Sequence, residues 1–175
     1  MLDFSRNHFE LFGLPASYTL DSERLDRAYR NLQAEIHPDK FAHAGEAEQR
    51  LAMQWATRVN EAYQTLRRPF ERADYLLQLR GIHAMDAKNT SMPMDFLVQQ
   101  MEWREQLEDA KTTRDVAVLE RLEKNLRGEA RDYQARLAEE IDLRRNDSLA
   151  AETLRKLRFT DKLLAEVGAA YEDME

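Results

Sequence analysis

Residues 36–41 read Ile-His-Pro-Asp-Lys-Phe, and this stretch decides how the first half of the chain folds. Pro38 supplies no backbone N–H and disfavours helical geometry at the residue before it, so a helix that arrives here ends at His37. One amphipathic helical pattern precedes the stretch, and a longer one begins after a polar break at residues 42–45. The sequence therefore predicts a rigid corner between two helices, which displays an imidazole ring and a carboxylate.

The two helical patterns are predicted to form an antiparallel hairpin. The first runs from about residue 21 to residue 36, with Asp21 or Ser22 as its N-cap, and the second runs over residues 46–67. Because the loop between them is short, each helix covers the apolar side of the other. The apolar positions at helical spacing are Leu25, Ala28, Tyr29, Leu32 and Ile36, then Leu51, Ala52, Trp55, Val59, Ala62, Tyr63 and Leu66.

Two shorter segments flank the hairpin and are predicted to complete its core. They are residues 7–14 and residues 69–80, and the second starts at Pro69, whose missing N–H costs nothing in a first helical turn. Their apolar residues are Phe9, Leu11, Phe12 and Leu14, then Phe70, Leu76 and Leu77.

This order of elements (short helix, long helix, His-Pro-Asp, long helix, short helix) resembles a J-domain, the module by which DnaJ-type co-chaperones act on DnaK-type chaperone ATPases. The resemblance covers roughly residues 3–80. The stretches that carry it are His8-Phe9-Glu10-Leu11-Phe12-Gly13-Leu14, Arg27-Ala28-Tyr29, His37-Pro38-Asp39-Lys40 and Val59-Asn60-Glu61-Ala62-Tyr63-Gln64-Thr65-Leu66.

The resemblance implies that the domain performs no chemistry itself. It implies instead that His37, Pro38 and Asp39 dock on the ATP-bound chaperone and bias it toward hydrolysis. We expect Asp39 to matter most, because a carboxylate fixed at a corner can compete for a charge-assisted hydrogen bond within the partner. Further chaperone contacts are expected from Tyr29, Arg30, Arg27 and Lys40.

Composition limits the classes of protein that fit. Charged residues make up 34% of the chain and only nine positions are Gly or Pro, which is typical of helical proteins. No segment has the apolar length that spans a membrane, and the start, Met-Leu-Asp-Phe, has neither a basic leader nor a signal-peptide core. The chain has no cysteine, and its net charge of −7 argues against nucleic acid as the main partner. We therefore expect a soluble cytoplasmic protein.

The second half is predicted to be an antiparallel three-helix bundle. Turn-forming residues gather in residues 81–93, and helical patterns follow over about 94–110, 114–145 and 149–172. The predicted core positions in the second and third of these helices are Leu119, Leu122, Leu126, Tyr133, Leu137 and Ile141, then Leu154, Leu157, Leu164, Val167 and Tyr171. The predicted fold is thus all-α, with a J-domain at 1–80, a connection at 81–93 and a three-helix domain at 94–175.

The first helix of the bundle has apolar residues on both faces. At about 100° per residue, Phe96, Gln100, Trp103, Leu107 and Ala110 form the core stripe. The opposite face carries Leu97, Val98, Met101, Glu102, Glu105 and Asp109, and Phe159 lies opposite the core stripe of the last helix. Single surface apolar residues are ordinary. Four of them together on an acidic background favour an interface.

The same half resembles the C-terminal domain of HscB-type iron–sulfur co-chaperones. The matching stretches are Phe96-Leu97, Glu102-x-Arg104-Glu105-x-Leu107 and Arg155-Lys156-Leu157-Arg158-Phe159-x-Asp161-Lys162. The resemblance implies that this domain holds an IscU-type cluster scaffold, which the J-domain delivers to an HscA-type, DnaK-like chaperone. The scaffold-binding positions it implies are Leu97, Val98, Met101, Glu102, Glu105, Asp109 and Phe159. Eukaryotic members carry a cysteine-rich metal site, which this sequence lacks, so a bacterial protein is expected.

Other interpretations of these residues remain open at this point. His37 could be a helix-terminating histidine without a partner. An enzyme would use His37, Asp39 and His43 as metal ligands, but no regular helix presents these three together, so neither a metal nor a cofactor is expected. A J-domain protein with an unrelated client would share the corner and differ in the face formed by Leu97, Met101 and Phe159.

Overall fold

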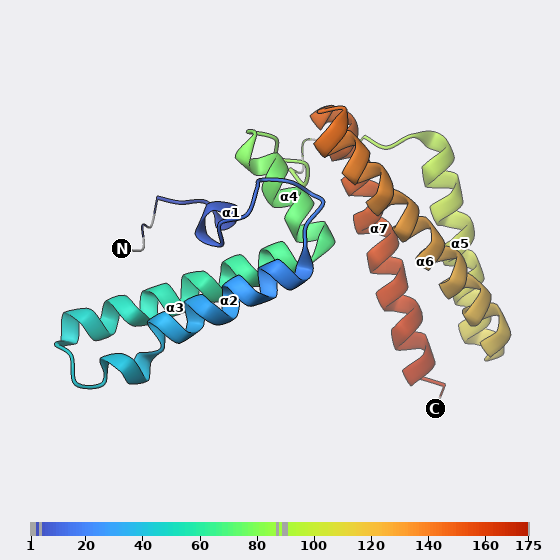
Figure 1. Cartoon of the computed structure of the whole chain (residues 1–175). Coiled ribbons are helices and arrows are strands. Elements are labelled where there is room, and N and C mark those ends of the chain that lie inside the picture. The colour runs from blue at the N-terminus through green and yellow to red at the C-terminus, as the bar shows by residue number, and fades with distance from the viewer. Residues whose placement is uncertain (1–2, 4, 87, 89–90, 175) are drawn as a thin grey trace. The chain divides into compact units, whose positions relative to one another are not determined.

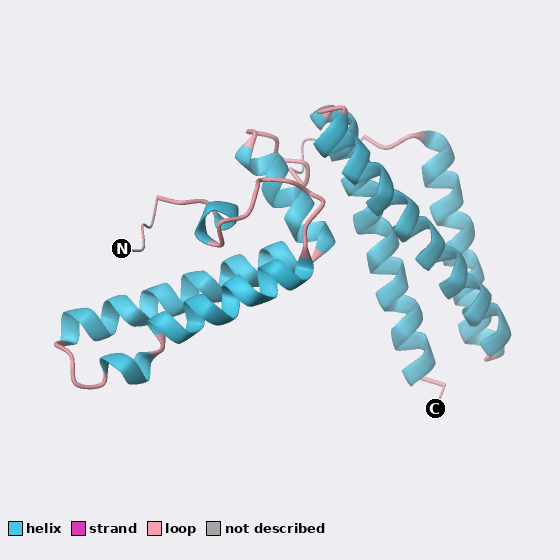
Figure 2. Cartoon of the chain, viewed as in Figure 1, coloured by secondary structure: helices cyan, strands magenta, loops and turns pink. Residues whose placement is uncertain are grey.

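The computed structural model of the protein describes residues 3, 5–86, 88 and 91–174. Every regular element in this part of the chain is a helix, as Figure 2 shows, so the predicted all-α fold is confirmed. The chain divides into two compact units, Met1–Leu76 and Leu77–Glu175. The elements, labelled in Figure 1, are α1 (His8–Leu11), α2 (Ser22–Ile36), the 3₁₀ turn η1 (Pro38–Phe41), α3 (Glu46–Arg67), α4 (Pro69–Leu79), α5 (Met94–Thr113), α6 (Val116–Ala138), the π-helical segment η2 (Glu139–Leu143) and α7 (Asp147–Glu172).

The helices α2 and α3 form the predicted hairpin (Figure 1). The Asp21 side chain caps α2 by accepting a hydrogen bond from the backbone N–H of Arg24. The helix ends at Ile36 because His37, which precedes a proline, has an extended ψ of 130°. Of the side chains predicted to line the hairpin, those that are buried are Leu25, Ile36, Ala52, Trp55, Val59, Ala62 and Leu66.

The predicted burial of Leu51 is wrong, because its side chain is 47% exposed. The antiparallel pairing of the hairpin brings Ala56 beside Ile36, the last residue of α2. The next residue, Ala52, is buried, so Leu51 lies at the edge of the covered side of α3. A helical wheel gives the direction of a side chain but not how far the neighbouring elements cover it.

The elements α1 and α4 supply the rest of the core of the first unit. Asn7 and Glu10 cap α1 reciprocally, since the side chain of each accepts a hydrogen bond from the backbone N–H of the other. The ring of His8 stacks on Tyr75 of α4 with 4.2 Å between ring centroids. The backbone N–H of His8 donates a hydrogen bond to the Tyr75 hydroxyl at 3.0 Å. The residues of the segment 7–14 that were predicted to be core, Phe9, Leu11, Phe12 and Leu14, are all buried.

The second unit contains the three bundle helices α5, α6 and α7. Their shared core includes Trp103, Leu107 and Ala110 from α5, Leu119, Leu122 and Leu126 from α6, and Leu163, Val167 and Ala170 from α7. Asp115 caps α6 by accepting from the Val118 N–H, and Asn146 caps α7 by accepting from the Leu149 N–H.

Two details of the bundle differ from the sequence prediction. The segment predicted as one helix over about 114–145 is α-helical only to Ala138 and ends in a π-helical turn, closed by a bond from the Arg144 N–H to the Glu139 carbonyl. In α7 the fully buried leucine is Leu163, while Leu164, the predicted core residue, is only partly buried.

The boundary between the two compact units falls within α4, between Leu76 and Leu77. The end of α4 belongs with the bundle, because Arg80 donates hydrogen bonds to the Ile141 carbonyl and to the Asp147 carboxylate. The functional division into residues 1–80, 81–93 and 94–175 stays a prediction.

Candidate functional site

The His-Pro-Asp corner is built by a change in backbone geometry at one residue. His37 is the C-cap of α2 and also the N-cap of η1, so the chain leaves one helix and enters a tighter turn without a loop. The backbone N–H of Asp39 donates to His37 Nδ1 at 3.3 Å, and the N–H of Lys40 donates to the His37 carbonyl at 2.9 Å. These bonds hold the imidazole over the start of the turn.

The charged groups of the corner face solvent. The side chain of Asp39 is 90% exposed and that of His37 is 59% exposed, with Asp39 Oδ2 lying 3.5 Å from His37 Nδ1. Lys40 is exposed as well. Because both side chains are exposed, the proximity of these two groups contributes little to folding stability. The corner is therefore an accessible carboxylate on a rigid turn, which suits recognition better than structural support.

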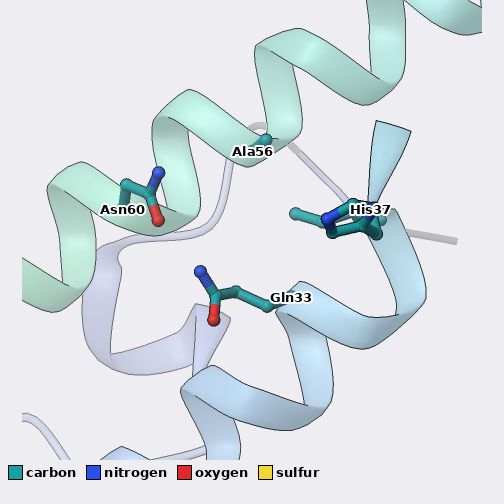
Figure 3. A pocket seen from close by; sticks show the side chains of 5 residues that line it. Gln33, His37, Ala56 and Asn60 are labelled. Atoms are coloured by element: carbon teal, nitrogen blue, oxygen red, sulfur yellow. The ribbon is translucent and has the colours of Figure 1, made fainter. Parts of the chain in front are cut away.

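A pocket of about 210 Å³ lies beside this corner, between α2 and α3 (Figure 3). Gln33 of α2 and His37, which follows the end of α2, line one side, and Ala56 and Asn60 line it from α3. The fifth lining residue is Ile36. One wall of the pocket is thus formed by the same histidine that stands at the corner.

The other predicted chaperone-contact residues lie on α2 in two different environments. Arg27 and Arg30 are exposed. Tyr29 is partly buried, because its ring stacks on Tyr63 of α3 with 3.9 Å between centroids and its hydroxyl donates to Asn60 Oδ1 at 2.7 Å. The structure therefore places the two arginines on a free face and gives Tyr29 a structural role in the hairpin.

A second exposed surface lies on α5, with the spacing i, i+3, i+4, i+7. Its four apolar residues are Met94, Leu97, Val98 and Met101, of which Met94 is 75% and Met101 70% exposed. The opposite stripe of the helix is buried, as the wheel predicted, at Phe96, Gln100, Trp103, Leu107 and Ala110. Sequence reasoning missed Met94, although the same spacing would have found it. We call Met94, Leu97, Val98 and Met101 the α5 apolar stripe.

Carboxylates border the α5 apolar stripe. Glu102, Glu105 and Asp109 are exposed, and so is Glu108, which the sequence analysis did not single out. Glu108 pairs with Lys111 at 3.1 Å, whereas Glu102 only accepts a hydrogen bond from Gln99. A partner that covers this surface would therefore need an apolar centre with a basic border.

Phe159 of α7 differs from the other predicted residues of this surface. It is 38% exposed, and its ring meets Phe96 edge-on with 5.9 Å between centroids. Phe96 is a core residue of α5. Phe159 therefore belongs partly to the exposed surface and partly to the contact between α5 and α7.

Two structural findings bear on the other classes of function. Within the described residues, no three His, Cys, Asp or Glu side chains lie together in a way that could hold a metal ion, so His37, Asp39 and His43 form no such group. Over the same part of the chain, none of the helices combines the length and the apolar character needed to cross a membrane.

Comparison with known proteins finds a family match for each of the two units. Residues 7–75 match the family described as the DnaJ domain, so the hairpin with its exposed His-Pro-Asp corner makes this a J-domain protein. Residues 92–168 match the family described as the HSCB C-terminal oligomerisation domain. The chain belongs to the HscB family of co-chaperones.

Full-length relatives agree with this assignment. The co-chaperone protein HscB homolog of Burkholderia thailandensis is 50% identical over 175 residues, covering 100% of this chain and 99% of the relative. The structure of chaperone HscB from Vibrio cholerae matches with a TM-score of 0.84 at 38% identity, over 97% of this chain and 100% of that one. The crystal structure of human co-chaperone protein HscB matches with a TM-score of 0.87 at 27% identity, over 96% and 83% of the two chains.

Proposed function

We propose that this protein binds an IscU-type iron–sulfur scaffold, delivers it to an HscA-type, DnaK-like chaperone and stimulates the ATPase of that chaperone. Residues 94–175 would hold the scaffold and residues 1–80 would act on the chaperone. The protein catalyses no reaction itself and needs no cofactor; it promotes cluster assembly and transfer in the bacterial cytoplasm. The observation that carries the proposal is that one chain presents two exposed surfaces of different chemistry, one in each compact unit.

On the chaperone side, the proposed mechanism rests on the fixed position of Asp39. A carboxylate held on a short turn gives up little conformational freedom when it binds, and it can accept a charge-assisted hydrogen bond from a cation of the chaperone. If that cation has a different partner in the resting chaperone, binding changes the balance between its two states. Stimulation of hydrolysis is then a coupling free energy between two binding events. Arg27 and Arg30 would attract an acidic chaperone surface.

On the scaffold side, the apolar residues would provide affinity and the carboxylates would provide selectivity. A few apolar anchors at the centre of an interface usually contribute most of the binding energy. Here those anchors would be Leu97, Val98 and Met101, with Phe159 beside them. Glu102, Glu105 and Asp109 would favour a scaffold with basic residues around its apolar contact, since like charges in that position would be repelled.

Asp39→Asn tests the proposal directly. The substitution keeps the shape of the side chain and removes its charge, so we expect ATPase stimulation to be abolished. An exposed site normally changes the free energy of unfolding by only about 0.5 kcal/mol, so the fold should be retained. The measurement is steady-state ATP hydrolysis by a DnaK-like chaperone of the HscA type, with circular dichroism as the folding check.

Glu48→Gln is the matched control, because Glu48 is another exposed carboxylate in the same unit, in the first turn of α3. It should stimulate the chaperone as the unmodified protein does. Full stimulation by a correctly folded Asp39→Asn variant would end the proposed role of the corner.

A further inference from the structure

The pocket between α2 and α3 has no part in the function proposed above, although it shares His37 with the corner. Its two apolar lining residues are Ile36, which is buried, and Ala56, which is partly buried. Its polar lining comes from the ring of His37 and from the amides of Gln33 and Asn60, and the two amides lie on opposite sides of the gap between the helices (Figure 3). The pocket therefore combines an apolar surface with three side chains that can form hydrogen bonds.

The hydrogen bonds around the pocket determine which amide atoms are available. Gln33 Nε2 donates to the Tyr29 hydroxyl at 2.6 Å, and that hydroxyl donates to Asn60 Oδ1 at 2.7 Å. A hydroxyl has one proton to donate, so this chain of bonds orients both amides. It leaves Gln33 Oε1 as an acceptor and Asn60 Nδ2 as a donor with no partner among the described residues. One acceptor and one donor are what a peptide group requires.

The size and the surroundings of the pocket indicate what kind of ligand it takes. At about 210 Å³ it is smaller than the roughly 300–1,000 Å³ of pockets that enclose a drug-sized molecule, so it suits one side chain of a protein partner. Met53, one turn before Ala56 on α3, is 63% exposed. Arg30 is exposed one turn before Gln33 on α2.

We propose that this pocket binds an extended segment of the chaperone, with one aliphatic side chain against Ile36 and Ala56. A peptide group of the same segment donates to Gln33 Oε1 and accepts from Asn60 Nδ2. The occupant is the chaperone because His37 belongs both to the pocket and to the surface assigned to that partner, so the two contacts are continuous. This inference rests on the proposed function and adds a specific recognition site to it.

Filling the pocket tests the inference. In the full-length protein, Ala56→Leu places a larger side chain in the space meant for the chaperone residue, and we expect about a tenfold weaker affinity for the ATP-bound chaperone. Gln54→Leu is the matched control, since Gln54 is exposed on the same helix about 160° around from Ala56. The control should bind normally. Scaffold binding and melting temperature should be unchanged in both variants.

Gln33→Ala provides a second test that does not depend on the first variant folding. It removes the proposed acceptor from an exposed position and leaves the bond between Tyr29 and Asn60 in place, and we expect a severalfold weaker chaperone affinity. If the Ala56→Leu variant unfolds, the chaperone affinity of the Gln33→Ala variant alone tests the inference.

Three outcomes would overturn the inference. The first is chaperone affinity in Gln33→Ala equal to that of the unmodified protein. The second is an equal loss in the Gln54→Leu control. The third is an effect of Ala56→Leu on self-association, measured by sedimentation, rather than on chaperone binding, because the occupant would then be a second copy. Asp39→Asn, measured in parallel, distinguishes failure of the pocket inference from failure of the proposed function. If Asp39→Asn abolishes ATPase stimulation while the pocket variants bind the chaperone normally, the proposed function stands and only the pocket contact is wrong.

Discussion

Tyr29 connects the two long helices of the J-domain through both its ring and its hydroxyl. The ring stacks on Tyr63, and the hydroxyl accepts from Gln33 while it donates to Asn60. Tyr63 in turn donates to Asp26 Oδ1 at 2.9 Å. A substitution at Tyr29 would therefore loosen the hairpin as well as alter any chaperone contact. Substitutions at exposed residues of the same surface, such as Arg30, would test chaperone binding with less effect on folding stability.

His8 makes the stability of the first unit depend on pH. Burial against Tyr75 lowers the pKa of the His8 ring, and the Arg58 guanidinium lowers that pKa further. The unfolded chain therefore binds a proton more readily than the folded one, so stability rises with pH. The His8 contribution is complete above an unfolded pKa of about 6.5 and is lost as pH falls below it toward the folded pKa.

We expect His8→Phe to reduce this loss on acidification, because phenylalanine keeps the stack and cannot be charged. The measurement is the free energy of unfolding from urea titrations at about pH 7.5 and about pH 5.5, on either side of the range in which an ordinary histidine titrates. His43→Gln, at an exposed position, is the control and should keep the pH dependence of the unmodified protein. An unchanged pH dependence in His8→Phe would show that the ring of His8 is not the group responsible.

Periodicity predicts most of the core at the level of single residues and fails at its edges. Leu51 satisfies the helical spacing and is exposed, whereas the next residue, Ala52, is buried, so Leu51 lies at the edge of the covered side of α3. Leu163 and Leu164 are adjacent, and both fall near the core direction of α7, so only the position of the neighbouring helix decides that Leu163 is the fully buried one. Met94 was missed because it occupies the first position of α5 and the visible pattern begins three residues later.

At the scale of elements, the sequence predicts the helix ends that proline determines. It does not predict where the chain forms a 3₁₀ or a π-helical turn. Pro38 ends α2 and Pro69 begins α4, as the sequence predicts, because each removes a hydrogen-bond donor at a defined position. The 3₁₀ turn η1 and the π-helical segment η2 were not predicted. Both turns use ordinary helix-compatible residues, and the choice among i+3, i+4 and i+5 bonds depends on what packs against the turn.

The exposed face of α2 gives a prediction about rates. Reversing Arg27 and Arg30 to Glu should slow association with the chaperone by about tenfold or more at low salt, if that face attracts an acidic partner. The effect should shrink as salt rises, because screening weakens long-range attraction. The measurement is the association rate constant from stopped-flow mixing over a series of salt concentrations.

The control for this experiment changes the net charge equally at a different place. Arg121 and Arg131 are exposed on α6 in the second unit, and reversing both to Glu alters the total charge by the same amount. If both double variants slow association alike, only the net charge matters, and the α2 face has no specific part in the encounter.

At the scale of the whole molecule, the two exposed surfaces to which we assign binding roles occur on one chain but in separate compact units. The J-domain corner and the α5 apolar stripe need no direct contact to cooperate. If the proposed function holds, tethering alone would raise the effective concentration of a bound scaffold near a bound chaperone. The single helix α5 is decisive for this arrangement, because it supplies core residues on one side and the apolar stripe on the other.

The two sides of α5 should therefore respond in opposite ways to truncation. Trp103→Ala removes a buried aromatic side chain and should lower the free energy of unfolding by about 3–5 kcal/mol. The double variant Leu97→Ala, Met101→Ala alters exposed positions and should hardly change the melting temperature. It should nonetheless weaken scaffold binding strongly, since such anchors are typically worth about 2 kcal/mol or more each. Phe159 is left intact in this test, because its contact with Phe96 would mix stability with binding.

The consequence for the whole protein is that the double variant separates its two activities. Stimulation of the chaperone ATPase by the protein alone should survive, because the corner is untouched, while the additional stimulation seen with scaffold present should vanish. Scaffold affinity is measured by calorimetry and stimulation by steady-state ATP hydrolysis with and without scaffold. Unfolding of the double variant would place Leu97 and Met101 in the core after all. Normal scaffold affinity in a folded double variant would instead move the scaffold site away from α5, and the chaperone role of the corner would still hold.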